Sequence, residues 1–265
     1  MQPDDQFMKL FQRLNGLLGN SAPPVFDSPL APSFPFYVIG DVHGCDHLLE
    51  DLLEKIDAEE EGRGCQIVCV GDYVDRGENS AGVLRRLHEL CTSRDNNVTC
   101  LMGNHEDMML AFLDNPERSA RQWFRNGGLQ TLGSFRIGGI SQNMSGTDLI
   151  DAHDQLQEAL GTELAAWLRA LPTTWSNGNV TVVHAGANPD VSLTKQSRKN
   201  LIWGHPEFLK TPRRDGQWVV HGHTILPEIK VEQGRIGVDT GAYATGCLSA
   251  AYIAPSGMKI LTTTK

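Results

Sequence analysis

Residues 36–44 read FYVIGDVHG, a short apolar run that ends in glycine and is followed by an acidic residue and a histidine. An apolar run that ends in glycine and is followed by polar residues returns in QIVCVGDYVDRG at 66–77 and in VTCLMGNHE at 98–106. Helical patterns around 46–57 and 79–91 separate the three runs. This alternation predicts a βαβαβ unit with parallel strands.

The residues that follow these runs are expected to meet in space, because the carboxyl ends of neighbouring parallel strands lie side by side. Two later runs, VTVVHAG at 180–186 and WVVHGHT at 218–224, also carry histidines at their ends. A single Asp or His after a strand is more often a helix cap or a solvated loop residue. Five such strand ends in one chain predict a metal site instead. The metal-type residues at these ends are Asp41, His43, Asp72, Asp75, Asn104, His105, His184 and His223.

The chemistry of these donors narrows the choice of metal. Carboxylate and amide oxygens mixed with imidazole nitrogens suit Mn²⁺, Fe or Zn²⁺, whereas an all-thiolate set indicates structural zinc and an all-oxygen set indicates Mg²⁺ or Ca²⁺. Six ligands are enough for two ions. We therefore expect two divalent metal ions, with Mn²⁺ first and Fe or Zn²⁺ as alternatives.

Composition excludes several classes of protein. The chain of 265 residues has the length of one α/β domain with insertions. Its formal net charge of −9 argues against a long nucleic-acid footprint. No apolar stretch reaches the roughly 18 residues of a membrane span, and no secretory signal is evident. We expect a cytoplasmic protein, and its six cysteines, which form no C-x-x-C pair, are expected to be core thiols.

The chain divides into an arm and a main domain. Residues 1–35 predict an N-terminal helical arm followed by a Pro-rich connector, and we expect the helix to dock on the domain's own surface. Residues 36–265 form the main domain. Within it, the stretch at about 107–175 predicts a helical insertion, with leucines at four-residue intervals between 156 and 168. The runs from 180 to 254 predict a second group of strands that includes antiparallel pairs.

The ordered series GDVHG, GDYVDRG, GNHE, HAG and HGHT resembles the phosphoprotein phosphatase branch of the calcineurin-like metallophosphoesterases. The likeness spans residues 37 to about 250, and the WFRNGG and VDTGAYATG segments resemble the bacterial serine/threonine protein phosphatases. The resemblance implies an α/β (α+β) fold in which two mixed β-sheets pack as a sandwich flanked by helices. It also implies a binuclear metal centre at the strand ends.

The resemblance further implies a set of metal ligands. Two ions roughly 3.5–4 Å apart would share a hydroxide and hold the phosphoryl oxygens while the hydroxide attacks phosphorus. No covalent phosphoenzyme is required by this mechanism. Asp72 would bridge both ions, the first ion would also bind Asp41 and His43, and the second would also bind Asn104, His184 and His223.

Further residues are expected to act in catalysis and substrate binding. His105 resembles the family's GNHE histidine and would protonate the leaving alkoxide, while Asp75 accepts from the other ring nitrogen and favours the imidazolium. Arg76 would clamp phosphate oxygens with a forked pair of hydrogen bonds. Asn104 would contact the substrate as well as a metal. The candidates to support metal-bound imidazoles are Asp239 and His221.

His205, in LIWGHPEFL, departs from the family pattern. Bacterial relatives usually carry a phosphate-binding arginine at this position. His205 would serve as a weaker, pH-dependent donor to substrate phosphate, or Arg198, Arg213 or Arg214 would approach from a loop. Under the first alternative, His205→Arg should lower the KM for a phosphate monoester.

The leading hypothesis is a serine/threonine protein phosphatase, because the complete GDYVDRG and GNHE blocks resemble that class. Its substrate would be a phosphorylated protein or a small phosphorylated molecule, with no nucleic-acid partner. The nearest alternative is a diadenosine tetraphosphate hydrolase, which uses nearly the same metal blocks and cleaves an anhydride. A non-catalytic binding module of the same fold is a third hypothesis, against which the intact ligand set argues. Neither the physiological substrate nor the oligomeric state can be inferred from the sequence.

Overall fold

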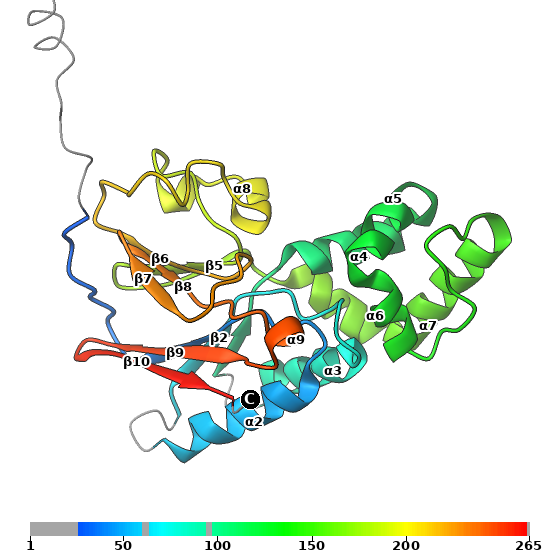
Figure 1. The fold of residues 1–265 in the computed structure, drawn as a ribbon, viewed down its shortest axis with the longest axis horizontal. Coiled ribbons are helices and arrows are strands. Elements are labelled where there is room, and N and C mark those ends of the chain that lie inside the picture. The colour runs from blue at the N-terminus through cyan, green and yellow to red at the C-terminus, as the bar shows by residue number, and fades with distance from the viewer. Residues whose placement is uncertain (1–25, 60–63, 94–96, 264–265) are drawn as a thin grey trace, which may run out of the picture.

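The computed structural model describes residues 26–59, 64–93 and 97–263 (Figure 1). The helix expected in the N-terminal arm lies outside these residues. The described part of the connector runs against the second sheet, where the backbone N–H groups of Ala31 and Ser33 donate to the side chains of Asn179 and Asn177.

The first sheet contains the predicted βαβαβ unit. Its five strands lie in the order β10-β9-β1-β2-β3. The strands β1, β2 and β3 are parallel, as expected, whereas β9 runs antiparallel to β1 and to β10. The five strands are β1 (Phe36–Ile39), β2 (Gln66–Cys69), β3 (Val98–Cys100), β9 (Ser249–Ala254) and β10 (Gly257–Thr262).

The second sheet is also mixed and has the strand order β4-β5-β6-β8-β7. Its central strands β5, β6 and β8 are parallel, and the edge strands β4 and β7 are antiparallel to their neighbours. The two mixed sheets confirm the expected fold class. The five strands are β4 (Thr174–Asn177), β5 (Val180–Val183), β6 (Trp218–His221), β7 (Lys230–Glu232) and β8 (Arg235–Gly237).

The packing of the first sheet explains why its strands are apolar on both faces. Phe36 and Val38 of β1 belong to the core between the two sheets, while Tyr37 and Ile39 belong to the core beneath the helices. All four side chains are at most 1% exposed. A strand covered on both faces gives a continuous apolar run rather than an alternating one, as FYVI does.

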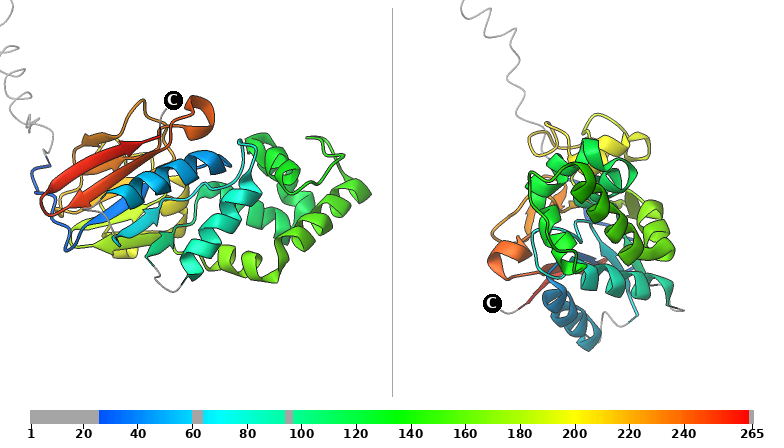
Figure 2. Two further views of the ribbon diagram at one scale, coloured as in Figure 1. Left: turned by 90° about the horizontal axis from the view of Figure 1, so that it is seen from below. Right: turned by 90° about the vertical axis from the view of Figure 1, so that its right-hand side faces the viewer.

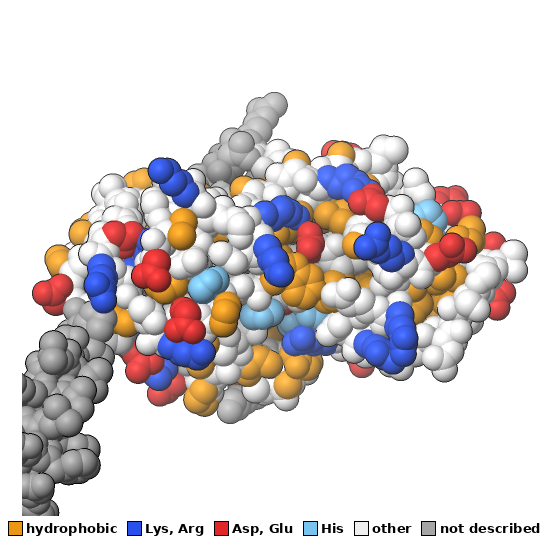
Figure 3. All heavy atoms as spheres, turned by 90° about the horizontal axis from the view of Figure 1, so that it is seen from above, with side chains coloured by type: hydrophobic (Ala, Val, Ile, Leu, Met, Phe, Trp, Pro, Cys, Tyr) orange, Lys and Arg blue, Asp and Glu red, His pale blue; other side chains and the backbone are white. Residues whose placement is uncertain are grey.

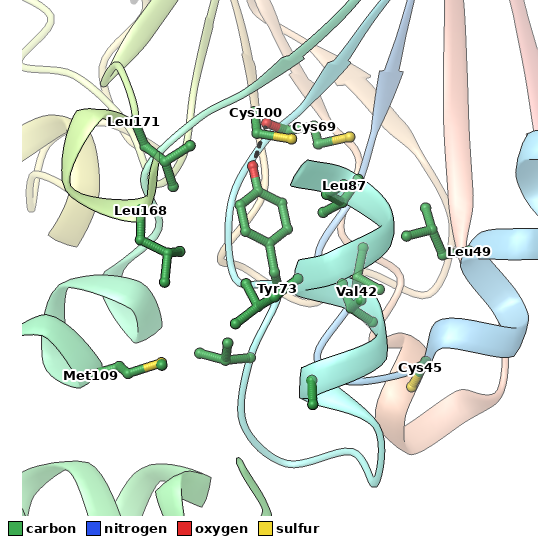
Figure 4. Close-up of a cluster of buried hydrophobic side chains, with 14 of the residues drawn as sticks. Val42, Cys45, Leu49, Cys69, Tyr73, Leu87, Cys100, Met109, Leu168 and Leu171 are labelled. Atoms are coloured by element: carbon green, nitrogen blue, oxygen red, sulfur yellow. Dashed lines mark hydrogen bonds between the residues drawn. The ribbon is translucent and has the colours of Figure 1, made fainter. Parts of the chain in front are cut away.

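Two helices cover the outer face of the first sheet (Figures 1 and 2). They are α2 (Asp46–Ala58) and α3 (Ser80–Thr92), and each agrees with the helical pattern in the sequence to within one residue at either end. Figure 4 shows Leu49 and Leu87 from these helices in the core that also surrounds Tyr73. This core fixes the loop that follows β2, which carries several of the predicted site residues.

The helices between β3 and β4 gather at one end of the sheets, where they form a helical lobe (Figure 2). The last helix of the lobe bends at Gly161, which has a φ of 69°. Among the described residues, no helix combines the length and apolar character needed to cross a membrane. The lobe consists of α4 (Asn104–Asp114), α5 (Pro116–Trp123), η2 (Phe124–Gly128), α6 (Leu129–Ser134) and α7 (Gly146–Ala170). The short helices outside it are η3 (Leu193–Lys195), α8 (Arg198–Trp203) and α9 (Ala242–Thr245).

Candidate metal centre

The loops after β1, β2, β3, β5 and β6 converge, and the predicted ligands meet around the carboxylate of Asp72. Its Oδ2 lies 3.5 Å from Nε2 of His43, and its Oδ1 lies 3.3 Å from Nε2 of His184. All three side chains are at most 2% exposed. Asp72 therefore faces an imidazole with each of its oxygens, which is the position expected of a carboxylate shared by two ions.

Asn104 joins the His184 side of this cluster. Its Oδ1 lies 2.9 Å from Nε2 of His184 and 2.8 Å from Nδ1 of His223. The carboxylate of Asp41 accepts hydrogen bonds from the backbone N–H of His223, with N–O distances of 3.0 and 3.2 Å. The structure thus brings the predicted ligands of the second ion together and ties Asp41 to the same loop.

Two triads of potential ligands share Asp72. One contains His43 and His105, and the other contains His184 and His223; within each triad the ligand atoms lie within 4.8 Å of one another. A shared carboxylate between two imidazole groups suits a binuclear site for divalent metals.

The hydrogen bonds of two imidazoles show that the residues fit metal ions. Nδ1 of His43 donates to the Val74 carbonyl at 2.8 Å, and Nδ1 of His184 donates to the Val70 carbonyl at 3.1 Å. Burial lowers the pKa of His43 to about 3 and that of His184 to about 4, so both rings are neutral. Each Nε2 then presents a lone pair, not a hydrogen, to the oxygens of Asp72. Converging lone pairs of this kind are the donors that a divalent cation requires.

The charge of the site also favours bound cations. Burial, with the neighbouring charges of Asp239 and Asp72, raises the pKa of Asp41 well above its ordinary value. Burial likewise raises the pKa of Asp239 to about 6. Buried carboxylates that lie close together are stabilised as anions by metal ions.

The backbone of the site is held in an unusual conformation. Seven non-glycine residues in the described ranges have positive φ, and five of them belong to the site. L-residues rarely adopt this region, and strained residues of this kind cluster at functional sites. The five are His43 (44°), Asp72 (55°), Asp75 (73°), Arg76 (68°) and His223 (62°).

Glu106 holds the strained loop after β2 in place. This fully buried carboxylate accepts hydrogen bonds from the backbone N–H groups of Asp72 at 2.8 Å, Tyr73 at 2.7 Å and Val74 at 3.1 Å. Sequence reasoning did not assign a role to Glu106, although it stands in the GNHE block. The hydroxyl of Tyr73 anchors the same loop by donating to the Leu101 carbonyl at 2.7 Å.

His105 and Asp75 form the pair that the sequence suggested. Nδ1 of His105 lies 2.7 Å from Oδ2 of Asp75, and its Nε2 lies 3.8 Å from Oδ2 of Asp72. Burial lowers the pKa of His105, but Asp72 and Asp75 outweigh burial, and the net direction is upward. The imidazole therefore stands at the edge of the cluster with one nitrogen fixed and the other directed towards its centre.

The WFRNGG segment and the start of α6 hold this pair in place. Nε1 of Trp123 lies 3.0 Å from both carboxylate oxygens of Asp75, and the Thr131 hydroxyl donates to Oδ1 of Asp75 at 2.6 Å. Gly127 has a φ of 108°, and a Cβ there would come within 2.5 Å of the Arg76 backbone nitrogen. Sequence reasoning missed Trp123 and Thr131, because their contacts with Asp75 join segments 48 and 56 residues apart.

Arg76 is placed to bind an anion. Its guanidinium carbon lies 4.9 Å from the ring centroid of Tyr243, whose ring also contacts His43 at 5.3 Å between centroids. No ion pair in the described ranges joins Arg76 to a carboxylate. Sequence reasoning missed Tyr243, which orients the guanidinium from α9.

The structure separates the candidates for a second phosphate clamp. His205 lies in the turn after α8, where its Nδ1 accepts from the backbone N–H of Glu207 at 3.3 Å. Arg213 is buried and is bound to Asp215 and to two backbone carbonyls, so it is engaged in structure. Arg214 is exposed. Arg198 is half exposed and forms an ion pair with Asp107 in the first turn of α4.

Three further side chains near the site form no hydrogen bond with the metal-type imidazoles in the described ranges, namely Asp239, His221 and Cys45. The carboxylate of Asp239 accepts from the backbone N–H of Gly241 at 2.8 Å. Nδ1 of His221 lies 3.0 Å from the carbonyl of Gly222. Burial raises the pKa of Cys45 to about 11, which keeps its thiol protonated. Backbone carbonyls, not Asp239 or His221, orient His43 and His184.

The surface over the helical lobe and the loops carries histidines close to its middle, with lysine and arginine side chains around them (Figure 3). Basic side chains on this face can attract an anionic substrate, although the whole chain is acidic.

The site has a carboxylate shared between neutral imidazoles, and it lies at the edge of a two-sheet sandwich. These features together suit a binuclear metallohydrolase. A family model described as "Calcineurin-like phosphoesterase" matches residues 34–227, which is more than half of the chain. The chain belongs to the calcineurin-like phosphoesterase family, as the order of its motifs suggested.

Relatives and solved structures agree with this family. The chain is 27% identical over 235 residues to an asymmetrical bis(5′-nucleosyl)-tetraphosphatase of Oceanobacillus iheyensis, covering 80% of this chain and 86% of that protein. It is 31% identical over 161 residues to a symmetrical bis(5′-nucleosyl)-tetraphosphatase of a Janthinobacterium species, covering 60% of this chain and 46% of that protein. It thus spans about half the length of the second relative.

Two solved structures share the fold. A putative diadenosine tetraphosphatase superimposes with a TM-score of 0.59 at 21% identity, covering 89% of this chain and 98% of that one. A protein serine/threonine phosphatase from Saccharomyces cerevisiae superimposes with a TM-score of 0.56 at 18% identity, covering 88% of this chain and 81% of that one. At these identities the likeness shows the fold alone.

Proposed function

We propose that this chain hydrolyses the phosphoanhydride of dinucleoside polyphosphates. The observation that carries the proposal is the likeness, over four-fifths of the chain, to a bis(5′-nucleosyl)-tetraphosphatase. The sequence alone had favoured a serine/threonine protein phosphatase and held this activity as the alternative. The protein phosphatase remains the second candidate, supported by the complete GDYVDRG and GNHE blocks.

The proposed ligands are those whose donor atoms converge on the site. When bound, two divalent ions supply Lewis acidity and activate water at neutral pH. Mn²⁺ is the ion we propose, since it accepts carboxylate, amide and imidazole donors together. Asp72 would contact both ions, Asp41 and His43 would hold the first, and Asn104, His184 and His223 would hold the second.

The other residues of the site act on the substrate and the leaving group. Arg76 would bind non-bridging phosphate oxygens, because its guanidinium is half-buried, oriented by Tyr243 and unpaired within the described chain. His105 would hold a proton on Nε2 for the leaving oxygen, while Asp75 fixes the ring through Nδ1. Asn104 would contact substrate from the start of α4. His205 is proposed only as a weaker, more distant phosphate contact.

The direct test compares two substrates side by side. Diadenosine tetraphosphate and a phosphothreonine peptide would be incubated with the Mn²⁺-loaded protein, with Asp72→Asn as the blank. Nucleotide products would be separated by chromatography and peptide turnover followed by phosphate release. A higher kcat/KM for the dinucleotide is expected, and preference for the peptide would make the second candidate the function. Turnover of neither substrate above the blank, with Mn²⁺ or Zn²⁺, would contradict the assignment of an active enzyme.

A further inference from the structure

A groove beside the metal centre has no role in the chemistry described so far. It consists of a hollow of about 360 Å³ and an adjoining one of about 180 Å³, which share Asp107, Gln122 and Trp203. The larger hollow alone falls within the range of about 300–1,000 Å³ that small-molecule sites occupy. We call this feature the α4–α8 groove, and the residues that define it are Asp107, Arg118, Gln122, Arg198, Lys199 and Trp203.

The α4–α8 groove begins next to the reaction centre. Asp107 follows Asn104 by three residues on α4, so the two side chains lie on neighbouring positions of the same helix face. Three residues of an α-helix span about 4.5 Å along the axis. A substrate whose phosphate reaches Asn104 therefore has its next groups at the mouth of the groove.

An aromatic side chain is held in this groove and remains accessible. Trp203 is 36% exposed, and its Nε1 donates to Oδ2 of Asp107 at 3.0 Å. Arg198 donates to the other carboxylate oxygen of Asp107, also at 3.0 Å. Asp107 thus fixes the position of the indole, and a fixed indole loses little side-chain freedom when a flat ligand stacks on it.

The groove also has positive charge that the described chain does not neutralise. Arg198 is paired with Asp107, but no ion pair within the described ranges engages Lys199 or Arg118. The two unpaired cations are local features in a chain whose net charge is −9. An aromatic platform beside lysine and arginine side chains is the combination that binds a nucleobase together with its phosphates.

We propose that the α4–α8 groove binds one nucleotide portion of a dinucleoside polyphosphate. Its base stacks on Trp203, while Lys199 and Arg118 contact phosphates beyond the one that is attacked. This inference rests on the proposed function and names the residues that would give it substrate specificity. A phosphopeptide has fewer phosphate charges to offer these cations and no base for the indole, so the dinucleotide fits the groove better.

The test compares a substrate that carries nucleosides with one that does not. Diadenosine tetraphosphate and p-nitrophenyl phosphate would be assayed with Trp203→Ala, Trp203→Phe and Lys199→Ala, with Lys210→Ala as a matched control outside the groove. Trp203→Ala is expected to raise the KM for the dinucleotide roughly 5- to 150-fold, equivalent to about 1–3 kcal/mol of base stacking. Trp203→Phe should retain most of the affinity, because phenylalanine also stacks.

The nucleoside-free substrate and the second groove residue give two further expectations. The kcat and KM for p-nitrophenyl phosphate are expected to be unchanged in every variant, which also shows that the variants fold. Lys199→Ala should raise the KM for the dinucleotide and flatten its dependence on salt, while Lys210→Ala should leave the KM unchanged.

The assays distinguish an error in the assignment of the groove from an error in the proposed function. If the native protein hydrolyses the dinucleotide but Trp203→Ala leaves its KM unchanged, or changes both substrates equally, the groove assignment is overturned and the function stands. If the native protein turns over p-nitrophenyl phosphate but not the dinucleotide, both proposals fall. A rise in KM for a phosphothreonine peptide alone in Trp203→Ala would assign the groove to a peptide instead.

Discussion

Replacing His105 by asparagine should affect substrates according to how much their leaving groups need a proton. The side chain stands at the edge of the cluster, with Nδ1 held 2.7 Å from Asp75 and Nε2 turned towards Asp72. A positioned general acid contributes about 10²- to 10⁴-fold to rate. That contribution should be nearly complete for an alkoxide leaving group and small for a leaving phosphate, whose pKa is about 6.

The expected loss can be stated for a series of substrates. For a phosphothreonine peptide, His105→Asn should lower kcat by about 10²- to 10⁴-fold. For phosphotyrosine, whose phenol has a pKa of about 10, the loss should be intermediate. For diadenosine tetraphosphate it should be the smallest. The assay is kcat at saturating substrate for native and variant protein under the same metal loading.

The metal content of the variant distinguishes a general-acid role of His105 from a role as metal ligand. His105 belongs to one of the two triads around Asp72, so its loss would also lower activity if it were a ligand. Elemental analysis of the variant should show the same metal content as the native protein. An equal fall in kcat for all substrates would refute the general-acid role, and a loss of metal with it would show that His105 binds an ion.

Three other substitutions test the residues that support the site. Trp123→Phe removes the indole donor from the buried Asp75 carboxylate and should lower the free energy of unfolding by about 1–3 kcal/mol, measured by thermal denaturation. Trp175→Phe should have a smaller effect, because the Trp175 indole makes ring contacts but no hydrogen bond within the described ranges. Gly127→Ala should lower Tm and raise the KM, because the added Cβ meets the Arg76 backbone. The control is Gly139→Ala, at a positive φ in open space. Equal shifts in Tm and KM for the two variants would argue against the contact with Arg76. Arg76→Lys should raise the KM for phosphate substrates about 10-fold or more, because lysine lacks the forked donors. Arg85→Lys is the control and should leave the KM unchanged. An unchanged KM in Arg76→Lys would exclude Arg76 as the phosphate clamp.

The sequence predicted the parts of the fold that follow from strongly apolar runs. FYVI, QIVC and the VVH runs are strands because they are buried between layers, and their ends carry the residues that meet in the site. The edge strands β7 and β10 were not predicted. All three residues of β7 are exposed, and no residue of β10 is fully buried, so neither leaves a clear apolar pattern.

The site was predictable where residues stand inside the ordered motifs. Glu106, Trp123 and Tyr243 were missed for a different reason, since each acts through a partner far away in the sequence. The indole of Trp123, for example, reaches Asp75 from the end of α5, 48 residues further along the chain. No local pattern encodes such a contact.

Substrate choice was the least predictable feature. The metal blocks are nearly the same in protein phosphatases and in dinucleoside tetraphosphate hydrolases, so the blocks alone led to the phosphatase. The residues that we propose for nucleotide binding, Trp203 and Lys199, lie on α8, and no sequence motif around them indicates a nucleotide. Their significance depends on the groove that the fold creates.

Metal stoichiometry tests most directly whether Asp72 is shared by two ions. Protein stripped with a chelator would be titrated with Mn²⁺, and bound metal would be counted per chain for the native protein and for Asp72→Asn, with Asp148→Asn as a control on α7. The structure predicts two ions per native chain and per control chain, with fewer than two at the same free Mn²⁺ in Asp72→Asn. One ion in the native protein, or two in Asp72→Asn with unchanged affinity, would contradict it.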